Sequence, residues 1–345
     1  MTPFGLGIVG FGRLARQYYR PALRGLRDMN LLVADTLEAS RDAARRDLPG
    51  ARVFADPAEL LAQRPDGVII ATPPSSHLPL WRAASSAGIP VLMEKPFVLR
   101  GELPAATGTP REQRLMMIDF NRRFWGPYRR IAELVRSGAI GEVTGAELVL
   151  EVNVRPWSTV TSHRFDPAEG GALFDLGSQS VDLAGWLLGR EPSAVRAVAE
   201  HRPGTGDAVR IDLVFPDGVI ARCVVGYCDR TTERLCIEGR RGRIRMADPN
   251  MRVHLERGGG SSPWAAVSDL ALLGCRGVLR SRSMSRRSIG LAIGAFVQSV
   301  RRSVPFSPGF AEASRSARLL EAAARSLELG TAVDPMSLEN AAAHG

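Results

Sequence analysis

The sequence predicts an α/β protein whose N-terminal part is a doubly wound parallel sheet. Three observations support this fold class. Short apolar runs alternate with helical stretches over residues 1–120, a glycine-rich turn follows the first run, and other polar motifs come directly after later runs. Strands that alternate with helices form parallel sheets, and such sheets bind ligands beyond the carboxyl ends of their strands.

The first apolar run, residues 4–9, leads into Gly10-Phe11-Gly12-Arg13-Leu14-Ala15, and a helical stretch follows over residues 14–26. The turn has the form G-x-G-x-x-A. Its first two glycines allow a tight bend and a close approach of pyrophosphate, and the small sixth residue lets helix and strand pack closely. This pattern is typical of a Rossmann domain and predicts cofactor contacts at Gly10, Phe11, Gly12, Arg13 and Leu14.

A second apolar run, residues 30–34, ends at Asp35. An acidic residue at this place binds the adenosine ribose hydroxyls, which favours NAD over NADP. Arg41 and Arg45 follow within reach of a 2′-phosphate, so NADP stays open as a cofactor. The alternative is that Asp35 only shapes the turn or caps the helix predicted over residues 37–46.

The alternation continues to residue 120. We expect strands over residues 52–55, 67–71, 89–93 and 116–120, and helices over 57–63, capped by Asp56, and 77–87. Thr72, Pro73 and His77 follow one strand, and Glu94-Lys95-Pro96 follows the next. Because all of these come after strand ends, we expect them at the same edge of the sheet as the glycine-rich turn.

Lys95 is the only lysine among 45 lysine and arginine residues. Arginine can replace lysine as a surface cation, but it cannot release a proton near neutral pH. A single retained lysine therefore indicates a position where a titratable amine is needed, and Lys95 is the first candidate for a catalytic residue.

The composition sets limits on the class of protein. A chain of 345 residues with 45% hydrophobic and 23% charged residues suits two globular domains. No signal-peptide pattern and no run of about 18 apolar residues is found, so we expect a cytoplasmic protein without a membrane span. The four cysteines lack metal-ligand spacing, so we expect free thiols and no metal.

A basic stretch over residues 276–287 accompanies the net charge of +9. Three interpretations stay open: a solvated face ahead of the helix expected from Ile289, a site for an anionic substrate such as a nucleotide-diphosphate sugar, or attachment to an anionic membrane surface. Membrane attachment is the least favoured of the three. Nucleic-acid binding is not expected, because no helix-turn-helix, zinc or aromatic RNA-binding pattern accompanies the charge.

The second half begins near Asn121 and Arg123 with a helix over 127–137 and a long strand over 142–154. A loop with Arg155, Trp157, His163 and Arg164 follows, and then a helix over 172–188 that Gly189 should end. Asp175, Gln179 and Asp182 share one face of that helix. Alternating segments over 194–200, 208–215, 219–226, 234–238 and 243–246 predict a meandering sheet.

At this point the sequence resembles the Gfo/Idh/MocA family. The resemblance rests on the glycine-rich turn, the Ala71-Thr72-Pro73-Pro74-x-x-His77 segment, Glu94-Lys95-Pro96 and Gly170-Gly171-Ala172-Leu173-x-Asp175-x-Gly177. It implies a Rossmann domain at 1–120, a substrate and oligomerisation domain at 121–335 and a flexible tail at 336–345. The second domain should be α/β, built on a large, mostly antiparallel sheet whose open face often joins the subunits of a homo-oligomer, a dimer or a tetramer.

The resemblance also implies a reaction, hydride transfer between a nicotinamide and a secondary alcohol or ketone. The substrate would be a sugar, a cyclitol or a phosphorylated or nucleotide-linked relative. Lys95 matches the lysine that exchanges the proton. The family usually pairs Asp175 with a histidine four residues later, but this chain has Gln179, which cannot act as an acid or base.

This departure leaves several functions open. Lys95 acts with Asp175, or His163 enters from the loop and compensates, and Arg123 and His163 are further candidates for substrate contact. Alternatively the chain binds NAD(P) without turnover as a regulatory protein. A third possibility is a redox-neutral glycosidase or epimerase that keeps its NAD tightly bound.

Overall fold

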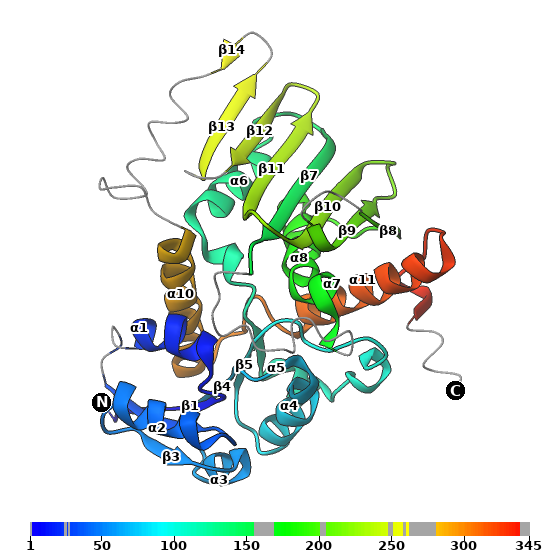
Figure 1. The fold of residues 1–345 in the computed structure, drawn as a ribbon. Helices are drawn as coiled ribbons and strands as arrows, with labels where there is room; N and C mark the ends of the chain where they lie inside the picture. The colour runs from blue at the N-terminus through cyan, green and yellow to red at the C-terminus, as the bar shows by residue number, and fades with distance from the viewer. Residues whose placement is uncertain are drawn as a thin grey trace. The chain divides into compact units, whose positions relative to one another are not determined.

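The computed structural model describes residues 2–23, 26, 28–154, 169–200, 205–247, 251–257, 260–261 and 281–338 (Figure 1). The chain divides into two compact units. Met1–Asn121 and Ser283–Ser314 form the first, and Arg122–Arg282 and Arg315–Gly345 form the second. We describe each unit by itself.

The first unit is built on a parallel sheet of six strands in the order β3-β2-β1-β4-β5-β6. The order reverses next to β1, so β1 and β4 form the switch point at which doubly wound sheets bind their ligands. Every strand predicted up to residue 120 is present. The strands are β1 (Phe4–Val9), β2 (Met29–Ala34), β3 (Arg52–Phe54), β4 (Gly67–Ile70), β5 (Val91–Met93) and β6 (Met116–Ile118).

Helices connect these strands as the sequence pattern predicts. The stretch expected as one helix over 14–26 is π-helical at η1 (Ala15–Tyr19) and α-helical at α1 (Arg20–Leu23). Asp56 caps the third helix as expected, because its carboxylate accepts the Ala58 N–H at 2.8 Å. The other elements are α2 (Glu38–Asp47), α3 (Pro57–Ala62), η2 (Pro74–Ser76), α4 (His77–Ser86), η3 (Leu103–Ala105) and α5 (Pro110–Arg114).

The helix α10 (Ser281–Arg302) brings a late part of the chain back to the first unit. The ring of Phe296 packs so closely on Gly67 of β4 that a Cβ at Gly67 would lie 2.8 Å from it. Beyond the helix, Ile118 N donates to Pro308 O at 3.1 Å, and Phe310 stacks on Trp81. A single boundary at 120/121 would assign residues 283–314 to the second domain. Their packing groups them with the first, because this sheet buries its apolar surface against them.

The second unit contains a sheet of eight strands in the order β14-β13-β12-β11-β7-β10-β9-β8. All neighbours are antiparallel except β7 and β10, which confirms the large, mostly antiparallel sheet. The expected meander is interrupted, because β7 lies in the middle. The strands are β7 (Val143–Val152), β8 (Ala194–Ala199), β9 (Thr205–Val214), β10 (Ile220–Cys228), β11 (Thr232–Gly239), β12 (Gly242–Ala247), β13 (Arg252–Arg257) and β14 (Gly260–Ser261).

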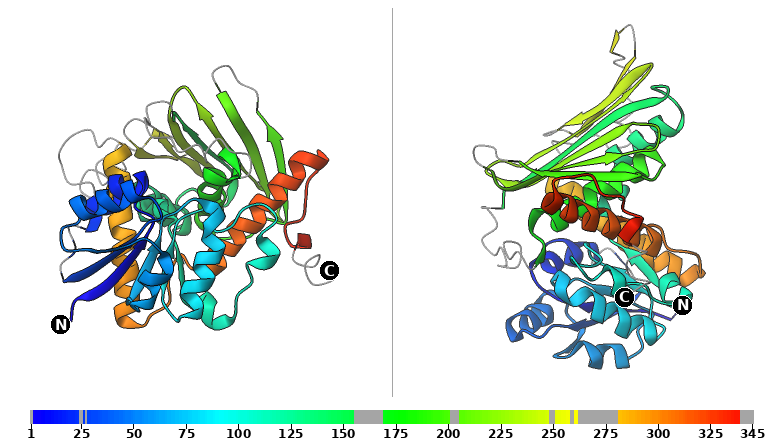
Figure 2. Two further views of the ribbon diagram at one scale, coloured as in Figure 1. Left: turned by 60° about the horizontal axis from the view of Figure 1, so that its bottom comes forward. Right: turned by 90° about the vertical axis from the view of Figure 1, so that its right-hand side faces the viewer.

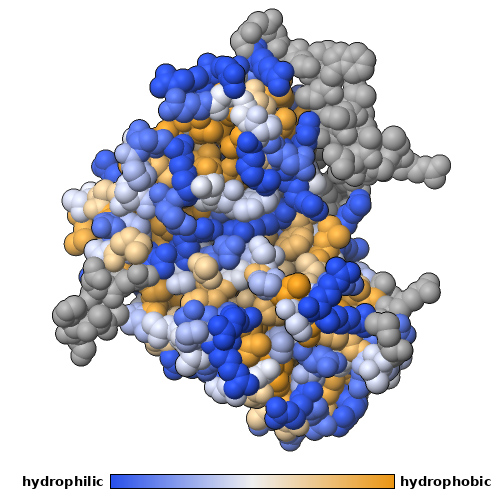
Figure 3. Space-filling view, turned by 180° about the vertical axis from the view of Figure 1, so that it is seen from behind, coloured by the Kyte–Doolittle hydropathy of each residue, from blue (hydrophilic) through white to orange (hydrophobic). Residues whose placement is uncertain are grey.

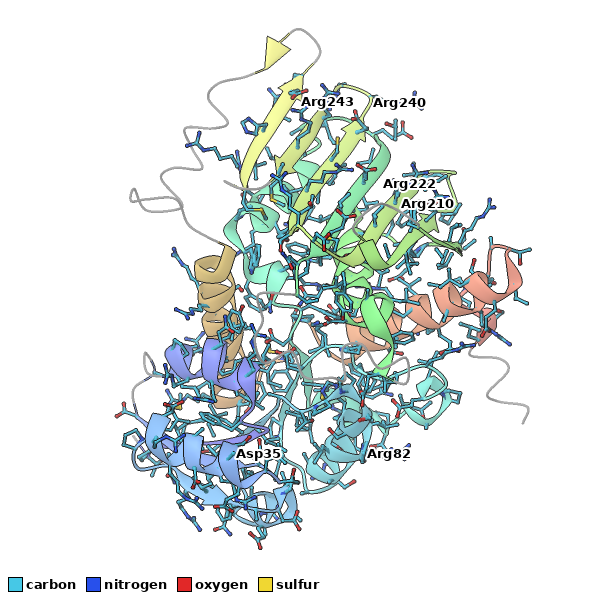
Figure 4. All side chains as sticks on the ribbon, in the orientation of Figure 1. Asp35, Arg82, Arg210, Arg222, Arg240 and Arg243 are labelled. Carbon is cyan, nitrogen blue, oxygen red and sulfur yellow. The ribbon has the colours of Figure 1, made fainter. Side chains whose placement is uncertain are left out.

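Helices cover one face of this sheet. Along β11 and β12, Leu235, Ile237 and Ile244 are buried, whereas Arg234 and Arg243 point to solvent. Figure 2 shows the helices of this unit gathered on one side of the strands, and Figure 4 labels arginines of β9, β10 and β12. The elements are η4 (Asn121–Phe124), α6 (Gly126–Arg136), α7 (Gly171–Asp175), α8 (Gly177–Leu188) and α11 (Phe310–Leu329).

The helix predicted over 172–188 has an irregular turn at Leu176, which separates α7 from α8. Gly189 ends α8 with φ +68°, the left-handed conformation expected at such a stop. On the face seen in Figure 3, hydrophilic residues cover most of the surface, with apolar patches between them. Among the described residues, no helix is long and apolar enough to cross a membrane.

Candidate functional site

The glycine-rich turn follows β1, and its first two glycines have different roles. Gly10 has φ +91°, and a Cβ there would lie 2.6 Å from Ala71 O, so only glycine fits. A Cβ at Gly12 would meet no atom within 4 Å. The backbone at Gly12 therefore borders open space at the carboxyl end of the strand, where a pyrophosphate can approach the start of the following helix. This turn fits a dinucleotide.

Asp35, at the end of β2, joins the turn to the next loop. Its Oδ2 accepts the Phe11 N–H at 2.7 Å, and its Oδ1 accepts the Leu37 N–H at 2.9 Å. The carboxylate therefore shapes the turn and also lies beside the cofactor loop, which combines the two interpretations of this residue. Arg41 donates to Asp35 O and pairs with Glu38, and Arg45 pairs with Glu38 and Asp42. Both arginines are thus engaged within α2 and its preceding loop.

Thr72, Pro73 and His77 follow β4 as expected, but the His77 ring is completely buried. Its Nδ1 lies 2.7 Å from Pro96 O, and its Nε2 lies 3.0 Å from Thr72 O. Both ring nitrogens thus face backbone carbonyls of two strand-end loops. The sequence predicted a cofactor contact for His77, whereas the structure gives the imidazole the role of tying the Thr72 loop to the Pro96 loop.

Lys95 lies after β5 at the same sheet edge as the glycine-rich turn, with β4 between the two strands. The residue is partly buried, and its peptide bond to Pro96 is cis. The Lys95 N–H donates to Glu94 Oε2 at 3.2 Å. Glu94 is itself buried, so the carboxylate beside the lysine is held within the protein.

A buried acidic cluster, formed by Tyr19, Glu94 and Asp119, lies behind Lys95. The Tyr19 hydroxyl contacts both carboxyls, Glu94 Oε1 and, at 3.0 Å, Asp119 Oδ2, and its single proton can be donated to only one of them at a time. Burial raises the pKa of Asp119 well above its usual value, and the neighbouring Glu94 carboxylate adds to the shift. Burial also raises the pKa of Glu94, against the opposing charge of Lys95. Asp119 thus holds its proton more tightly than a solvated aspartate does.

The sequence placed Glu94 at this sheet edge, whereas Tyr19 and Asp119 were not among the predicted site residues. Asp119 could have been found, because it directly follows the apolar run of β6 and so lies at the same sheet edge. Tyr19 lies in the π-helical segment, and no pattern in the sequence connects it to Glu94.

In the second unit, Asp175 and Gln179 come from the end of α7 and the first turn of α8. Asp175 Oδ2 accepts the Tyr227 hydroxyl at 2.9 Å. Gln179 is buried, and its Oε1 accepts a hydrogen bond from Arg122. Arg122 in turn forms two hydrogen bonds with Glu233 of β11, at 2.8 and 3.2 Å. Arg122, Glu233 and Tyr227 were not among the predicted site residues.

Arg123 was the predicted substrate arginine, but the structure gives it a different partner. Its Nε and Nη2 donate to the two carboxylate oxygens of Asp182 at 2.8 and 2.6 Å, and both side chains are buried. Arg123 therefore pairs with Asp182 inside the unit, and its neighbour Arg122 is the arginine that contacts Gln179. His163, the other predicted substrate residue, and the loop residues Arg155, Trp157 and Arg164 lie outside the described residues.

Two further features bear on ligands. Within the described ranges, no three His, Cys, Asp or Glu residues are arranged to hold a metal ion. In the basic stretch, residues 276–280 lie outside the described residues, and Arg286 and Arg287 of α10 are exposed.

Comparison with known proteins agrees with this arrangement. Residues 4–106 match the model of an oxidoreductase family with an NAD-binding Rossmann fold, and residues 128–245 match a GFO/IDH/MocA C-terminal domain. The rhizopine catabolism protein MocA of Rhizobium meliloti is 31% identical over 65% of this chain and 68% of its own length. The chain belongs to the Gfo/Idh/MocA family. The resemblance seen in the sequence is thereby confirmed, and the protein is an oxidoreductase with an NAD-binding Rossmann domain.

Two other comparisons extend the likeness. Inositol 2-dehydrogenase 4 of Saccharopolyspora erythraea is 28% identical over 74% of this chain and 78% of its own length. The crystal structure of scyllo-inositol dehydrogenase from Lactobacillus casei, with bound NAD(H) and scyllo-inositol, has a TM-score of 0.79 at 21% identity. It covers 97% of this chain and all of that one. At this identity the structural likeness supports the fold of both units.

Proposed function

We propose that this oxidoreductase transfers hydride between NAD and a secondary alcohol or ketone of a sugar or cyclitol. One observation carries the proposal: the only lysine of the chain lies at the carboxyl end of β5, at the sheet edge that holds the dinucleotide turn. A relative named inositol 2-dehydrogenase supports the substrate class.

In this proposal the bound NAD supplies the hydride acceptor or donor, and Lys95 supplies the proton chemistry. Oxidation of an alcohol releases the hydroxyl proton, and reduction of a ketone requires one at the same oxygen. A primary amine can exchange that proton, whereas arginine cannot. Glu94 is buried beside Lys95 and accepts its backbone N–H, which holds the loop that carries the amine.

The second unit contributes side chains that bind the substrate. Residue 179 is a glutamine, so it adds no acid or base to Lys95. Asp175 can accept a hydroxyl hydrogen, and Gln179 can form hydrogen bonds only, because an amide does not titrate near neutral pH. We therefore assign the proton step to Lys95 and substrate contacts to Asp175 and Gln179. A homo-oligomer joined through the open face of the second sheet is part of the same proposal, and sedimentation of the purified protein measures it directly.

The experiment that tests the function has two stages. Purified protein is first titrated with NADH and NADPH by fluorescence, and then assayed by absorbance with inositols, sugars and nucleotide sugars. Turnover of a cyclitol or sugar, with tighter binding of NADH than of NADPH, is the expected result. NADH binding without turnover on the whole panel would favour a regulatory protein. Tightly bound NAD that persists through purification, without net reduction, would favour a redox-neutral enzyme.

A further inference from the structure

The orientation of the Gln179 amide is fixed by its partner. Gln179 is 4% exposed, and its Oε1 accepts a hydrogen bond from Nη1 of Arg122. A guanidinium group can only donate, so the amide oxygen must face Arg122 and the amide nitrogen must face away. The usual ambiguity between oxygen and nitrogen of a glutamine is thus removed by chemistry.

The guanidinium group of Arg122 is itself held in place by several contacts. Its Nε and Nη2 form a two-point pair with the Glu233 carboxylate at 2.8 and 3.2 Å, and its guanidinium lies 5.1 Å from the ring centre of Trp125. Tyr128 donates its hydroxyl to Glu233 Oε1 at 2.6 Å. Paired forks of this kind fix the plane of the guanidinium group as well as its position.

The charges of this network are also fixed. Burial alone would lower the pKa of Arg122, but the Glu233 carboxylate more than compensates, and the pKa stays above its usual value. Burial and the charge of Glu233 together raise the pKa of Tyr128 well above its usual value, so the phenol remains a donor. Arg122 therefore keeps its charge and Tyr128 keeps its proton near neutral pH, and the amide of Gln179 does not titrate there.

Among the described residues, the amide nitrogen of Gln179 is a donor that faces away from Arg122. Gln179 Nε2 forms no hydrogen bond with the described residues. Asp175, four residues earlier, is an acceptor whose Oδ2 is held by Tyr227. Asp175 ends α7 and Gln179 lies in the first turn of α8, so the oriented amide donor and the held carboxylate acceptor come from two adjacent helix ends.

We propose that Arg122 and Glu233 are positioning residues that lock Gln179 as a hydrogen-bond donor to the substrate. The substrate group at Gln179 is then an acceptor oxygen, such as a carbonyl or ring ether. Its neighbouring group is a hydroxyl that donates to Asp175. This inference rests on the proposed function, and it narrows the substrate to polyols or hydroxyketones with these two groups side by side.

The first test reports on the lock without turnover. The chain has only five glutamines, Gln17, Gln63, Gln113, Gln179 and Gln298, so protein labelled with ¹⁵N in the glutamine side chains gives few signals. Loss of one pair of signals in Gln179→Glu assigns Gln179. We expect an order parameter near that of rigid backbone, about 0.85, in the native protein and a value below about 0.6 in Arg122→Met. Arg129→Met, which removes an exposed charge from α6, is the control and should leave the signal unchanged. A mobile Gln179 amide in the native protein would overturn the lock.

The second test replaces the hydrogen-bond donor of Gln179 that faces away from Arg122 by an acceptor. Gln179→Glu keeps the size of the side chain and its contact with Arg122 but replaces the donor by an acceptor. With myo-inositol and 2-keto-myo-inositol as probes, we expect kcat/KM to fall at least about 100-fold, while NADH affinity and thermal stability stay within about twofold and a few degrees. Glu233→Gln should reduce kcat/KM less, by about tenfold, because it only loosens Arg122.

Histidine at the same position gives a readout that a purely structural role would not affect. Gln179→His should add a titration near pH 6.5 to the kcat/KM profile, because imidazole titrates there and an amide does not. Full activity of Gln179→Glu would show that the amide donates nothing to the substrate and would overturn the inference. If the native protein turned over neither probe although NADH bound, the proposed substrate class would fail, and the order parameters would still decide the lock.

Discussion

The carboxylate of Asp35 accepts the backbone N–H of Phe11 at 2.7 Å, so the acidic residue at the end of β2 holds the middle of the glycine-rich turn. One side chain thus connects the two loops that a dinucleotide would contact. Because the second carboxylate oxygen accepts the Leu37 N–H, replacing Asp35 changes both the charge beside the proposed ribose site and the loop itself.

Asp35→Ser should loosen NAD more than NADP, because it removes the carboxylate that would bind ribose hydroxyls and repel a 2′-phosphate. We expect NADH affinity to fall by about tenfold or more, with a smaller change for NADPH. Fluorescence titration of both nucleotides measures the ratio. Asp35→Asn is the control for loop geometry, because its amide oxygen can still accept one N–H. Equal losses for both nucleotides would exclude a ribose contact.

The two glycines of the turn make a matched pair. Gly10→Ala should destabilise the fold by at least about 1–3 kcal/mol, because φ is +91° and the new Cβ would lie 2.6 Å from Ala71 O. Gly12→Ala should leave the melting temperature within about 1–2 °C of the native value, because its Cβ meets no atom. NADH affinity of Gly12→Ala should nevertheless fall at least about tenfold, since the added methyl group occupies the space for pyrophosphate. Native affinity in Gly12→Ala would place the pyrophosphate elsewhere.

Lys95→Ala should retain NADH binding within about threefold and lower turnover by at least about 100-fold, the usual scale of general acid–base catalysis. Lys95→Arg is the informative companion, because it keeps the positive charge but cannot release a proton. If the proton matters, both variants are inactive. If only the charge matters, the arginine variant keeps most of the rate, and unchanged turnover in Lys95→Ala would remove the catalytic assignment.

Asp182→Asn should lower the free energy of unfolding by about 3–5 kcal/mol, because it leaves Arg123 buried without its carboxylate partner. The exposed pair of Arg130 and Glu133 on α6 offers the control: Glu133→Gln should change stability by less than about 1 kcal/mol. Urea denaturation compares the three proteins. A marginal effect of Asp182→Asn would mean that Arg123 is not committed to a structural pair and is available for substrate.

The acidic cluster of Tyr19, Glu94 and Asp119 predicts how stability depends on pH. The pKa of Asp119 is higher in the folded than in the unfolded chain, so the folded state binds more protons above about pH 4. Stability from this group therefore falls as pH rises from about 4 towards the raised pKa. Asp119→Asn removes this proton, and its stability should decline less than that of the native protein between pH 5 and pH 8. Urea unfolding at the two pH values measures the difference, and parallel declines would mean that Asp119 ionises normally.

Much of the first unit could be predicted from the sequence. The lengths of the apolar runs and the turn residues between them predicted all six strands β1–β6. This works because a strand that is buried on both faces must be apolar throughout. The carboxyl ends of parallel strands lie at one edge of a sheet. The glycine-rich turn, Thr72 and Lys95 could therefore be placed at the same edge from the sequence. The segment at 283–314 escaped this reasoning, because nothing in a helical pattern indicates which of two sheets it covers.

The sequence by itself determined the dinucleotide turn and the unique lysine at a strand end, and its resemblance to the family showed that Gln179 stands where a histidine is usual. These are local properties, set by residue type and by spacing along one element. Tertiary structure alone decided which arginine serves Gln179, that His77 ties two loops, and that Tyr19 and Asp119 lie with Glu94. Such pairings join residues that are far apart in the chain. Arg122 and Gln179 are 57 positions apart, and Arg122 and Glu233 are 111 positions apart. Arg122 and Arg123 are equivalent in the sequence, but their side chains leave the backbone in different directions. Their partners therefore differ, and these partners lie on other strands and helices.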